Sequence, residues 1–294
     1  MLLGAIVDVD KVLAAKKEKD FKNIVGLREL IESLRENGIE VVEGSALSAK
    51  EILEKIKKMR VSVEECIVIS DSAKGVNETS KLGIPVIGFL AEDSEGWELS
   101  KADMLIEGFE EIDDIFVKRV YERAHHIPWI IAETPNCIIR ESVLEDLEYF
   151  FEIYTGEGME YVEPLADYKT EQEKLQAYIK NRYPFYEYGM WTVVDKQSGK
   201  VIGRAGIEER EINGEEKTEF GYMLHYLYRR RGIGTEICQA ILAYAKSTLY
   251  MEEIHAYTHP KNLPSQKLLN KLGFWFYGEV NNAGTKLSCF YKKL

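Results

Sequence analysis

Three arginines and two glycines stand together in the run Arg229-Arg230-Arg231-Gly232-Ile233-Gly234, the stretch of this 294-residue chain best suited to binding an anion. An apolar strand pattern precedes the run and a long amphipathic helix pattern follows it. Glycines let the main chain approach an anion closely, and a helix N-terminus offers unpaired N–H groups with partial positive charge. Arginines add full charges for phosphate oxygens. The run therefore predicts a pyrophosphate site, and the alternative interpretation is a basic turn that caps a helix.

A second motif follows the next apolar strand pattern. It begins at His259, has Asn262 and Ser265 at the start of an amphipathic helix, and ends at Gly273-Phe274. Asn262 can cap that helix, and its amide can also face a ligand. Each piece alone has a structural explanation as a cap, a core-facing stripe or a helix end. The order strand, R-x-x-G-x-G, helix, strand, N-x-x-S, helix, G-F is a compound pattern that chance rarely supplies.

The two motifs resemble those of the GNAT superfamily of N-acetyltransferases, and most closely its branch that acetylates ribosomal-protein N-termini (RimJ/RimL-like). The resemblance covers about residues 131–294, including the strand patterns Ile139-Arg140-Glu141 and Phe220–Leu224. Alternating strands, turns and helices in this half predict a mostly antiparallel α+β domain. The resemblance implies that its fourth and fifth strands diverge and admit the pantetheine arm of acetyl-CoA.

The resemblance also implies which residues bind acetyl-CoA. The pantetheine arm is expected along Tyr222, Met223 and Leu224, with Asn262 and Ser265 beside it. The pyrophosphate is expected on the loop and the helix start, at Arg229, Arg230, Arg231, Gly232, Ile233, Gly234 and Thr235.

The implied reaction is direct transfer of an acetyl group from the thioester to a primary amine in a ternary complex. It needs positioning, a base for the amine proton and donors for the developing oxyanion, for which main-chain N–H groups between the strands are expected. We expect Glu219 as the base, with Tyr257 and His259 as alternatives. Leu269 stands where many family members have a general-acid tyrosine, so Ser265, water or no acid would serve the thiolate.

The acceptor is a small-molecule or protein amine that these residues do not identify. The aromatic segment Tyr183–Tyr188 lies near where acceptors bind in this fold. It would line an amine pocket by cation–π contact, or it belongs to the core, which is the commoner fate of clustered aromatic residues.

The N-terminal half alternates short apolar strands with amphipathic helices, which predicts a parallel sheet covered on both faces. The expected strands are Leu3–Asp8, Ile39–Val42, Cys66–Ser70, Pro85–Phe89 and Met104–Ile106. The expected helices are Phe21–Asn37, Ala49–Arg60, Lys74–Leu82 and Phe109–Arg123. Asp8, Asp10 and Asp71 follow two of these strands, so they should meet at one edge of the sheet. There they would hold Mg2+, with Asp8 attacking phosphate and Asp10 as acid/base, or they are solvated strand-end acids.

The D-x-D-x-V and D-S-x-x-G-V motifs at Asp8 and Asp71 resemble those of the haloacid dehalogenase (HAD) superfamily of phosphohydrolases, over about residues 1–123. The resemblance implies a capless, Rossmann-like domain. This chain has room for one strand and one helix fewer than the family. Ser45 would serve as the second motif, but Ala46 stands where a lysine is expected and Lys50 is a displaced candidate. A degenerate or scaffolding domain is therefore favoured over a working phosphatase.

Composition sets broader limits. The net charge of −12 disfavours nucleic acid as a partner. The sequence has no apolar run long enough to predict a membrane-spanning helix. Four scattered cysteines without a C-x-x-C pair fit a reducing cytoplasm and give no zinc or disulfide pattern. The segment Ala124–Asn136, with two prolines and no clear period, is expected to be a linker. Domains 1–127 and 128–294 follow.

The sequence thus predicts a cytoplasmic acetyltransferase fused to a HAD-like domain. One alternative is a bifunctional phosphatase and acetyltransferase, which Mg2+-dependent phosphate release lost in Asp8→Asn would reveal. The other is a non-catalytic sensor that binds acyl-CoA. The oligomeric state is not predicted.

Overall fold

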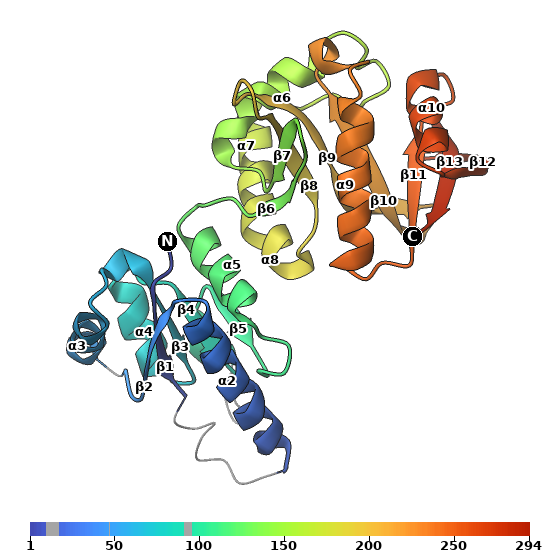
Figure 1. The fold of residues 1–294 in the computed structure, drawn as a ribbon. Helices are drawn as coiled ribbons and strands as arrows, with labels where there is room; N and C mark the ends of the chain where they lie inside the picture. Colours follow the sequence, from blue (N-terminus) through green and yellow to red (C-terminus); the bar gives the residue numbers. More distant parts are fainter. Residues whose placement is uncertain (10–17, 47, 91–95) are drawn as a thin grey trace. The chain divides into compact units, whose positions relative to one another are not determined.

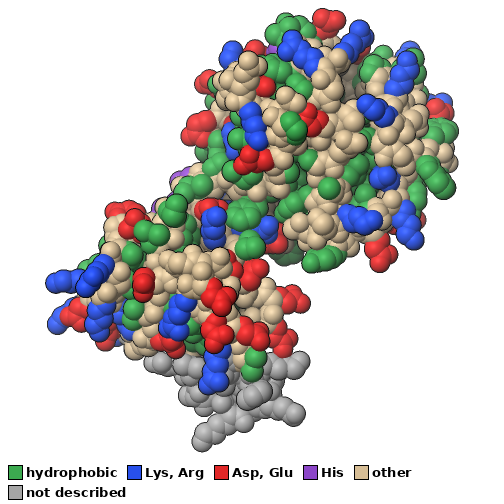
Figure 2. Space-filling view, viewed as in Figure 1, with side chains coloured by type: hydrophobic (Ala, Val, Ile, Leu, Met, Phe, Trp, Pro, Cys, Tyr) green, Lys and Arg blue, Asp and Glu red, His purple; other side chains and the backbone are tan. Residues whose placement is uncertain are grey.

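The computed structural model describes residues 1–9, 18–46, 48–90 and 96–294, so Asp10 lies outside the described residues. The chain forms two compact units, Met1–Ile127 and Pro128–Leu294. In the part of the chain described, no helix is long and apolar enough to cross a membrane. Acidic and basic side chains are interspersed on the face shown in Figure 2.

The first unit is a parallel sheet, as predicted, and its five strands lie in the order β2-β1-β3-β4-β5. Its strands are β1 (Gly4–Asp8), β2 (Glu40–Glu43), β3 (Cys66–Ser70), β4 (Val86–Phe89) and β5 (Met104–Ile106). Its helices are α2 (Glu18–Glu36), α3 (Ala49–Met59), α4 (Ala73–Lys81) and α5 (Asp114–Ala124), with short 3-10 turns η1 (Val63–Glu65) and η2 (Gly96–Leu99). One core holds side chains of α2 and α5 and another those of α3 and α4, so helices cover both faces.

Helix α5 begins later than the predicted start at Phe109. Asp113 accepts a hydrogen bond from the Phe116 N–H at 2.8 Å and sets the N-terminus of the helix. Phe109 instead packs before the helix, where its ring stacks on that of Phe89 with centroids 5.0 Å apart.

The second unit is built on an eight-stranded sheet in the order β12-β13-β11-β10-β9-β8-β7-β6, antiparallel except between β10 and β11. Its strands are β6 (Ile130–Glu133), β7 (Cys137–Arg140), β8 (Met190–Asp195), β9 (Val201–Ile212), β10 (Glu215–Leu224), β11 (Glu253–Thr258), β12 (Trp275–Asn282) and β13 (Thr285–Lys293). Its helices are α6 (Leu147–Tyr154), α7 (Tyr168–Ala177), α8 (Tyr183–Tyr186), α9 (Ile233–Ser247) and α10 (Leu263–Lys271). Short turns complete it: η3 (Leu144–Asp146), the π-helical η4 (Tyr178–Arg182) and η5 (Tyr226–Tyr228).

Helices cover the two faces of this sheet (Figure 1). On one face α9 packs Ile237 and Ile241 against strand residues such as Trp191 in the main core. On the other face α6 and α7 form a smaller core through Phe150 and Leu175. The sheet is therefore the layer that separates two helical coverings.

The expectation that Ala124–Asn136 is only a linker is wrong, because Ile130–Glu133 forms the edge strand β6. It pairs antiparallel with β7, and Ile131 is buried in the main core. Thr134 closes the turn to β7, since its hydroxyl donates to the Cys137 carbonyl at 3.1 Å. The two prolines thus flank a strand that tertiary pairing creates.

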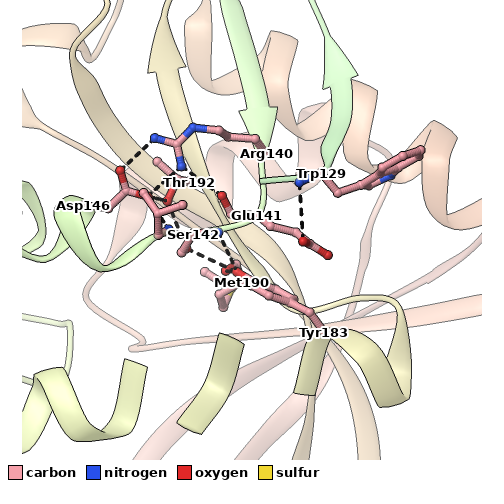
Figure 3. A network of polar contacts seen from close by, with 9 residues as sticks. Trp129, Arg140, Glu141, Ser142, Asp146, Tyr183, Met190 and Thr192 are labelled. Carbon is pink, nitrogen blue, oxygen red and sulfur yellow. Dashed lines mark hydrogen bonds and ion pairs between the residues drawn. The ribbon is translucent and has the colours of Figure 1, made fainter. Parts of the chain in front are cut away.

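A buried polar network ties α6 to the sheet (Figure 3). Arg140 of β7 donates two hydrogen bonds to the Asp146 carboxylate, at 2.7 and 2.8 Å. The Thr192 hydroxyl of β8 donates to the same carboxylate at 2.8 Å and contacts the Ser142 hydroxyl at 2.9 Å. Asp146 is only 2% exposed, so its charge depends on these partners.

Asp146→Ala is expected to lower the free energy of unfolding by about 3 to 5 kcal/mol, because it leaves Arg140 largely buried without its carboxylate. Urea titration followed by circular dichroism measures the change. Glu133→Ala is the matched control, since Glu133 pairs with Lys196 at 2.8 Å with its side chain 55% exposed, and should cost about 0 to 1 kcal/mol. Equal losses in the two variants would contradict the role given to the network.

Candidate active site

Strand β10 loses its parallel neighbour partway along its length. It pairs with β9 over its whole length, from Glu215 to Leu224. Its register with β11 consists of one pair, Glu219 with His255. The divergence of these two strands is as predicted, and it leaves the β11 side of Tyr222, Met223 and Leu224 without strand pairing in the described structure.

The basic loop follows directly. Arg230 and Gly232 have φ angles of 61° and 85°, in the left-handed region, and turn the chain into α9 at Ile233. Among the described residues no side chain caps this helix. Arg230, Arg231 and Gly232 are exposed. The loop therefore presents an open helix N-terminus flanked by two guanidinium groups, the arrangement that favours an anion.

Arg229 is directed elsewhere. Its Nε donates to the Leu224 carbonyl at 2.9 Å, and its Nη1 donates to the Gly158 carbonyl at 3.4 Å. Burial is the main cause that lowers the pKa of this guanidinium. Its donors are thus engaged by main-chain oxygens, which fits holding the loop in place better than contacting a phosphate.

The second motif lies across the same divergence. Asn262 caps α10 by accepting from the Ser265 N–H at 3.2 Å. The Tyr222 hydroxyl donates to the Ser265 carbonyl at 3.1 Å and lies 3.0 Å from the Ser265 hydroxyl. Tyr222 therefore connects β10 to α10. Leu269, at the position of the family tyrosine, is 1% exposed and belongs to the main core, and Thr235 accepts from Lys271 at 3.3 Å.

Glu219 lies where the strands begin to diverge, on the face opposite α9. Arg210 of β9 donates to both of its carboxylate oxygens, at 3.0 and 3.1 Å. Burial raises the pKa of the Glu219 carboxyl and is the largest influence, while Arg210 acts to lower it. Glu208, directly opposite on β9, accepts from the Tyr178 hydroxyl at 2.6 Å. The site therefore holds two facing carboxylates, one paired with a cation and one with a phenol.

The two alternative bases lie in different settings. Tyr257 shares the Glu219 face, and its ring centroid is 5.9 Å from the Arg210 guanidinium. Burial raises its pKa well above the ordinary tyrosine value. His259 lies in the turn after β11, where it accepts from the Lys261 N–H at 3.1 Å and stacks on Tyr161. The structure thus groups Tyr257, but not His259, with the Glu219–Arg210 pair.

Sequence reasoning missed Arg210, Glu208, Tyr178 and His255. Strand β9 extends to Ile212 and so brings Arg210 opposite β10. The signal was the run of charged residues Glu208-Glu209-Arg210 shortly before the Asn213-Gly214 turn.

The aromatic segment Tyr183–Tyr188 divides between core and surface. Tyr183 is 1% exposed, and its hydroxyl donates to the Met190 carbonyl at 2.7 Å. Phe185 is 78% exposed, and Arg182 already covers the Tyr186 ring at 4.7 Å. The core interpretation therefore holds for Tyr183.

In the first unit, Asp8 and Asp71 meet at the carboxyl edge of the sheet as predicted, each 2% exposed. The Asp71 N–H donates to the Asp8 carbonyl at 3.0 Å, and the Ser70 hydroxyl donates to the Asp8 carboxylate at 3.0 Å. Lys50 is largely exposed beside Glu54. The described residues contain no group of three or more His, Cys, Asp or Glu able to hold a metal, and Asp10 lies outside them.

Comparison with known proteins assigns the second unit. Residues 136–275 match the family model described as acetyltransferase (GNAT) domain. An uncharacterised N-acetyltransferase, p20 of Bacillus licheniformis, is 27% identical over 145 residues, which is 48% of this chain and 80% of that protein. The uncharacterised N-acetyltransferase YnaD of Bacillus subtilis is 29% identical over 142 residues, covering 48% and 79%.

Solved structures are similar too. The structure of RimL, a ribosomal L7/L12 alpha-N-protein acetyltransferase, aligns at 12% identity over 58% of this chain and 97% of that one, with a TM-score of 0.49. An acetyltransferase from Agrobacterium tumefaciens aligns at 18% identity over 55% and 94%, with a TM-score of 0.48. On the strength of the family match, the C-terminal half of this chain contains an acetyltransferase domain of the GNAT family.

Proposed function

We propose that this chain transfers the acetyl group of acetyl-CoA to a primary amine, by direct attack within a ternary complex. The observation that carries the proposal is the divergence of β10 from β11 beside an uncapped, exposed helix N-terminus with Arg230 and Arg231. The unpaired main chain of β10 suits an amide-containing arm, and the helix N-terminus with its arginines suits a pyrophosphate. A ligand that joins these two groups would fit both features.

The residues present fit acetyl-CoA. No side chain of the described residues occupies the helix cap, and a Cβ built on Gly232 would meet nothing within 4 Å, so the loop has room for phosphate oxygens. Arg230 and Arg231 would add charge there. Main-chain groups of Tyr222, Met223 and Leu224 would pair with the pantetheine amides and provide a donor for the oxyanion.

Glu219 is our candidate base. Its carboxylate lies at the point of divergence, and burial holds its pKa above the usual glutamate range. A base whose pKa approaches the working pH accepts a proton more effectively. Arg210 opposes burial and favours the ionised form of Glu219, which is the form that accepts a proton, and Glu208 adds a second carboxylate that disfavours an anion nearby. Buried Leu269 cannot protonate the thiolate, so the Tyr222–Ser265 hydroxyl pair or water would do so.

Release of the CoA thiol from acetyl-CoA across a panel of primary amines tests this function. We expect amine-dependent turnover by the full chain, and about a 100- to 10,000-fold lower kcat in Glu219→Gln, the range for loss of general-base catalysis. Circular dichroism of the variant checks that it folds. CoA binding without turnover on any amine would instead support the acyl-CoA sensor.

Removing Arg210 should move the pH dependence of the reaction. Because Arg210 lowers the pKa of Glu219 against the effect of burial, Arg210→Gln is expected to raise that pKa further. The base is active only when deprotonated, so the acid limb of kcat/KM should shift to higher pH. Lys246→Gln, an exposed residue in the last turn of α9, is the control and should leave the limb in place. A shift to lower pH would contradict Glu219 as the base.

For the first unit we propose a HAD-like domain in scaffolding or degenerate form. The parallel sheet brings Asp8 and Asp71 together at one edge, in keeping with the motifs. The Asp8 carboxylate, however, is buried and accepts from Ser70, and Lys50 is largely exposed beside Glu54. We therefore derive no metal-dependent step for this domain and favour the acetyltransferase as the single activity.

A further inference from the structure

A cavity of about 420 Å³ lies between the β9–β10 hairpin and strands β11, β12 and β13. The hairpin is fixed over these strands because the Asn213 N–H donates to the Asn282 side chain at 3.3 Å, and the Asn282 amide donates to the Glu211 carbonyl at 3.1 Å. The β9–β10 and β12–β13 hairpins are therefore joined near their turns, beside the cavity. Its volume suits a small organic molecule.

Three aromatic rings form one wall. His255 and Tyr257 have nearly parallel rings, with centroids 6.2 Å apart, and Tyr277 meets His255 edge-on at 5.9 Å. The hydroxyls of Tyr257 and Tyr277 are 3.4 Å apart. The remaining surface includes apolar side chains of Ile212 and Val280. A ligand here would contact aromatic rings and hydrocarbon side chains.

The charged groups of the lining are acidic in sum. Glu215 and Glu279 provide two negative charges and Lys217 one positive charge, and Glu279 pairs at 2.6 Å with Lys286, which lies outside the lining. Lys217 is paired with Glu215 at 2.8 Å, and burial is the main cause that lowers the pKa of His255, which favours the neutral ring. Aromatic rings beside a surface carboxylate such as Glu279 favour a cation and disfavour an anion.

The cavity adjoins the candidate reaction centre. His255 is the register partner of Glu219, and Tyr257 belongs to the cavity lining with its ring centroid 5.9 Å from the Arg210 guanidinium. Arg210 itself is neutralised by Glu219, which it contacts through two hydrogen bonds. An acceptor whose reactive amine lies near Glu219 would therefore extend its other end into the cavity.

We propose that this cavity is the subsite for the distal end of the acceptor, and that the acceptor carries a second cationic group on an apolar stem, as a diamine does. The assignment of the reactive end rests on the proposed acetyltransferase function. The preference of the cavity for an alkylammonium group rests on its own lining.

Three compounds that differ only at the distal end test the proposal: 1,5-diaminopentane, pentylamine and 5-aminopentanoate. Calorimetry with the full chain, with and without CoA, is expected to show the diamine binding about ten-fold or more tightly than pentylamine, with the carboxylate weakest. Where turnover is measurable, kcat/KM should follow the same order.

Variants place the effect in the cavity. Tyr277→Leu and Glu279→Gln are each expected to weaken diamine binding about five- to ten-fold, while pentylamine changes little. Trp275→Leu is the matched control, because Trp275 is an exposed aromatic on the same strand outside the cavity lining, and it should change neither.

Any of four results would overturn the proposal. These are equal affinities for the three compounds, tightest binding of 5-aminopentanoate, undetectable diamine binding, and equal effects of Tyr277→Leu and Trp275→Leu. Failure of the acetyltransferase function is distinguishable from these outcomes. In that case the chain would not bind CoA, whereas the order of amine affinities and its loss in Tyr277→Leu would still identify the cation subsite.

Discussion

The organisation of the second unit depends on one constraint, which is that β10 keeps β9 as a partner throughout but pairs with β11 only at Glu219. Main-chain N–H and C=O groups that a sheet leaves open need partners from elsewhere. Side chains bridge the gap between β10 and β11, because the Tyr222 hydroxyl of β10 donates to the Ser265 carbonyl on α10. Arg229 bonds the last carbonyl of β10, at Leu224, and so fixes where the strand stops and the basic loop begins.

The same divergence explains the charge arrangement. Glu219 lies at its origin with little exposure to solvent, so a cation is needed to keep a carboxylate there. Arg210 can reach it only because the β9–β10 hairpin runs well beyond the point of divergence, to the Asn213-Gly214 turn. Residues of that extension, from Ile212 to Lys217, also line the neighbouring cavity. A single long hairpin thus positions the candidate base, its counter-ion and the wall of the acceptor subsite.

Local patterns in the sequence predicted the elements that are buried on both faces. Cys66–Ser70 matches the central strand β3 residue for residue, because a central parallel strand is a continuous apolar run. Met104–Ile106 also matches an observed strand, although β5 lies at the edge of the sheet and Leu105 is exposed. The glycines and arginines of the basic loop also predicted where helix α9 begins, because this signal too lies in residues that are adjacent in the sequence. Strand β6 was missed, because its identity as a strand comes from pairing with β7 and not from any period of its own.

Contacts between distant residues were beyond the sequence. Glu219 was predicted from its place before the loop, but its partner Arg210 depends on strand register, and one more residue of β9 would have moved that side chain to the other face. Arg229 was expected at the phosphate with its two neighbours, yet the backbone geometry turns it toward Leu224 and Gly158. Neighbours in sequence can therefore have different tasks when the chain reverses direction between them.

The most direct measurement is calorimetric titration of the full chain with CoA, in the wild type and in the double variant Arg230→Glu/Arg231→Glu, with Lys246→Glu at the far end of α9 as the control. The account predicts that the wild type and Lys246→Glu bind with similar affinity. It predicts that the double variant binds at least about 100-fold more weakly, because two attractive charges at the helix N-terminus become repulsive. An unchanged affinity in the double variant, or no binding by the wild type at high micromolar CoA, would contradict it.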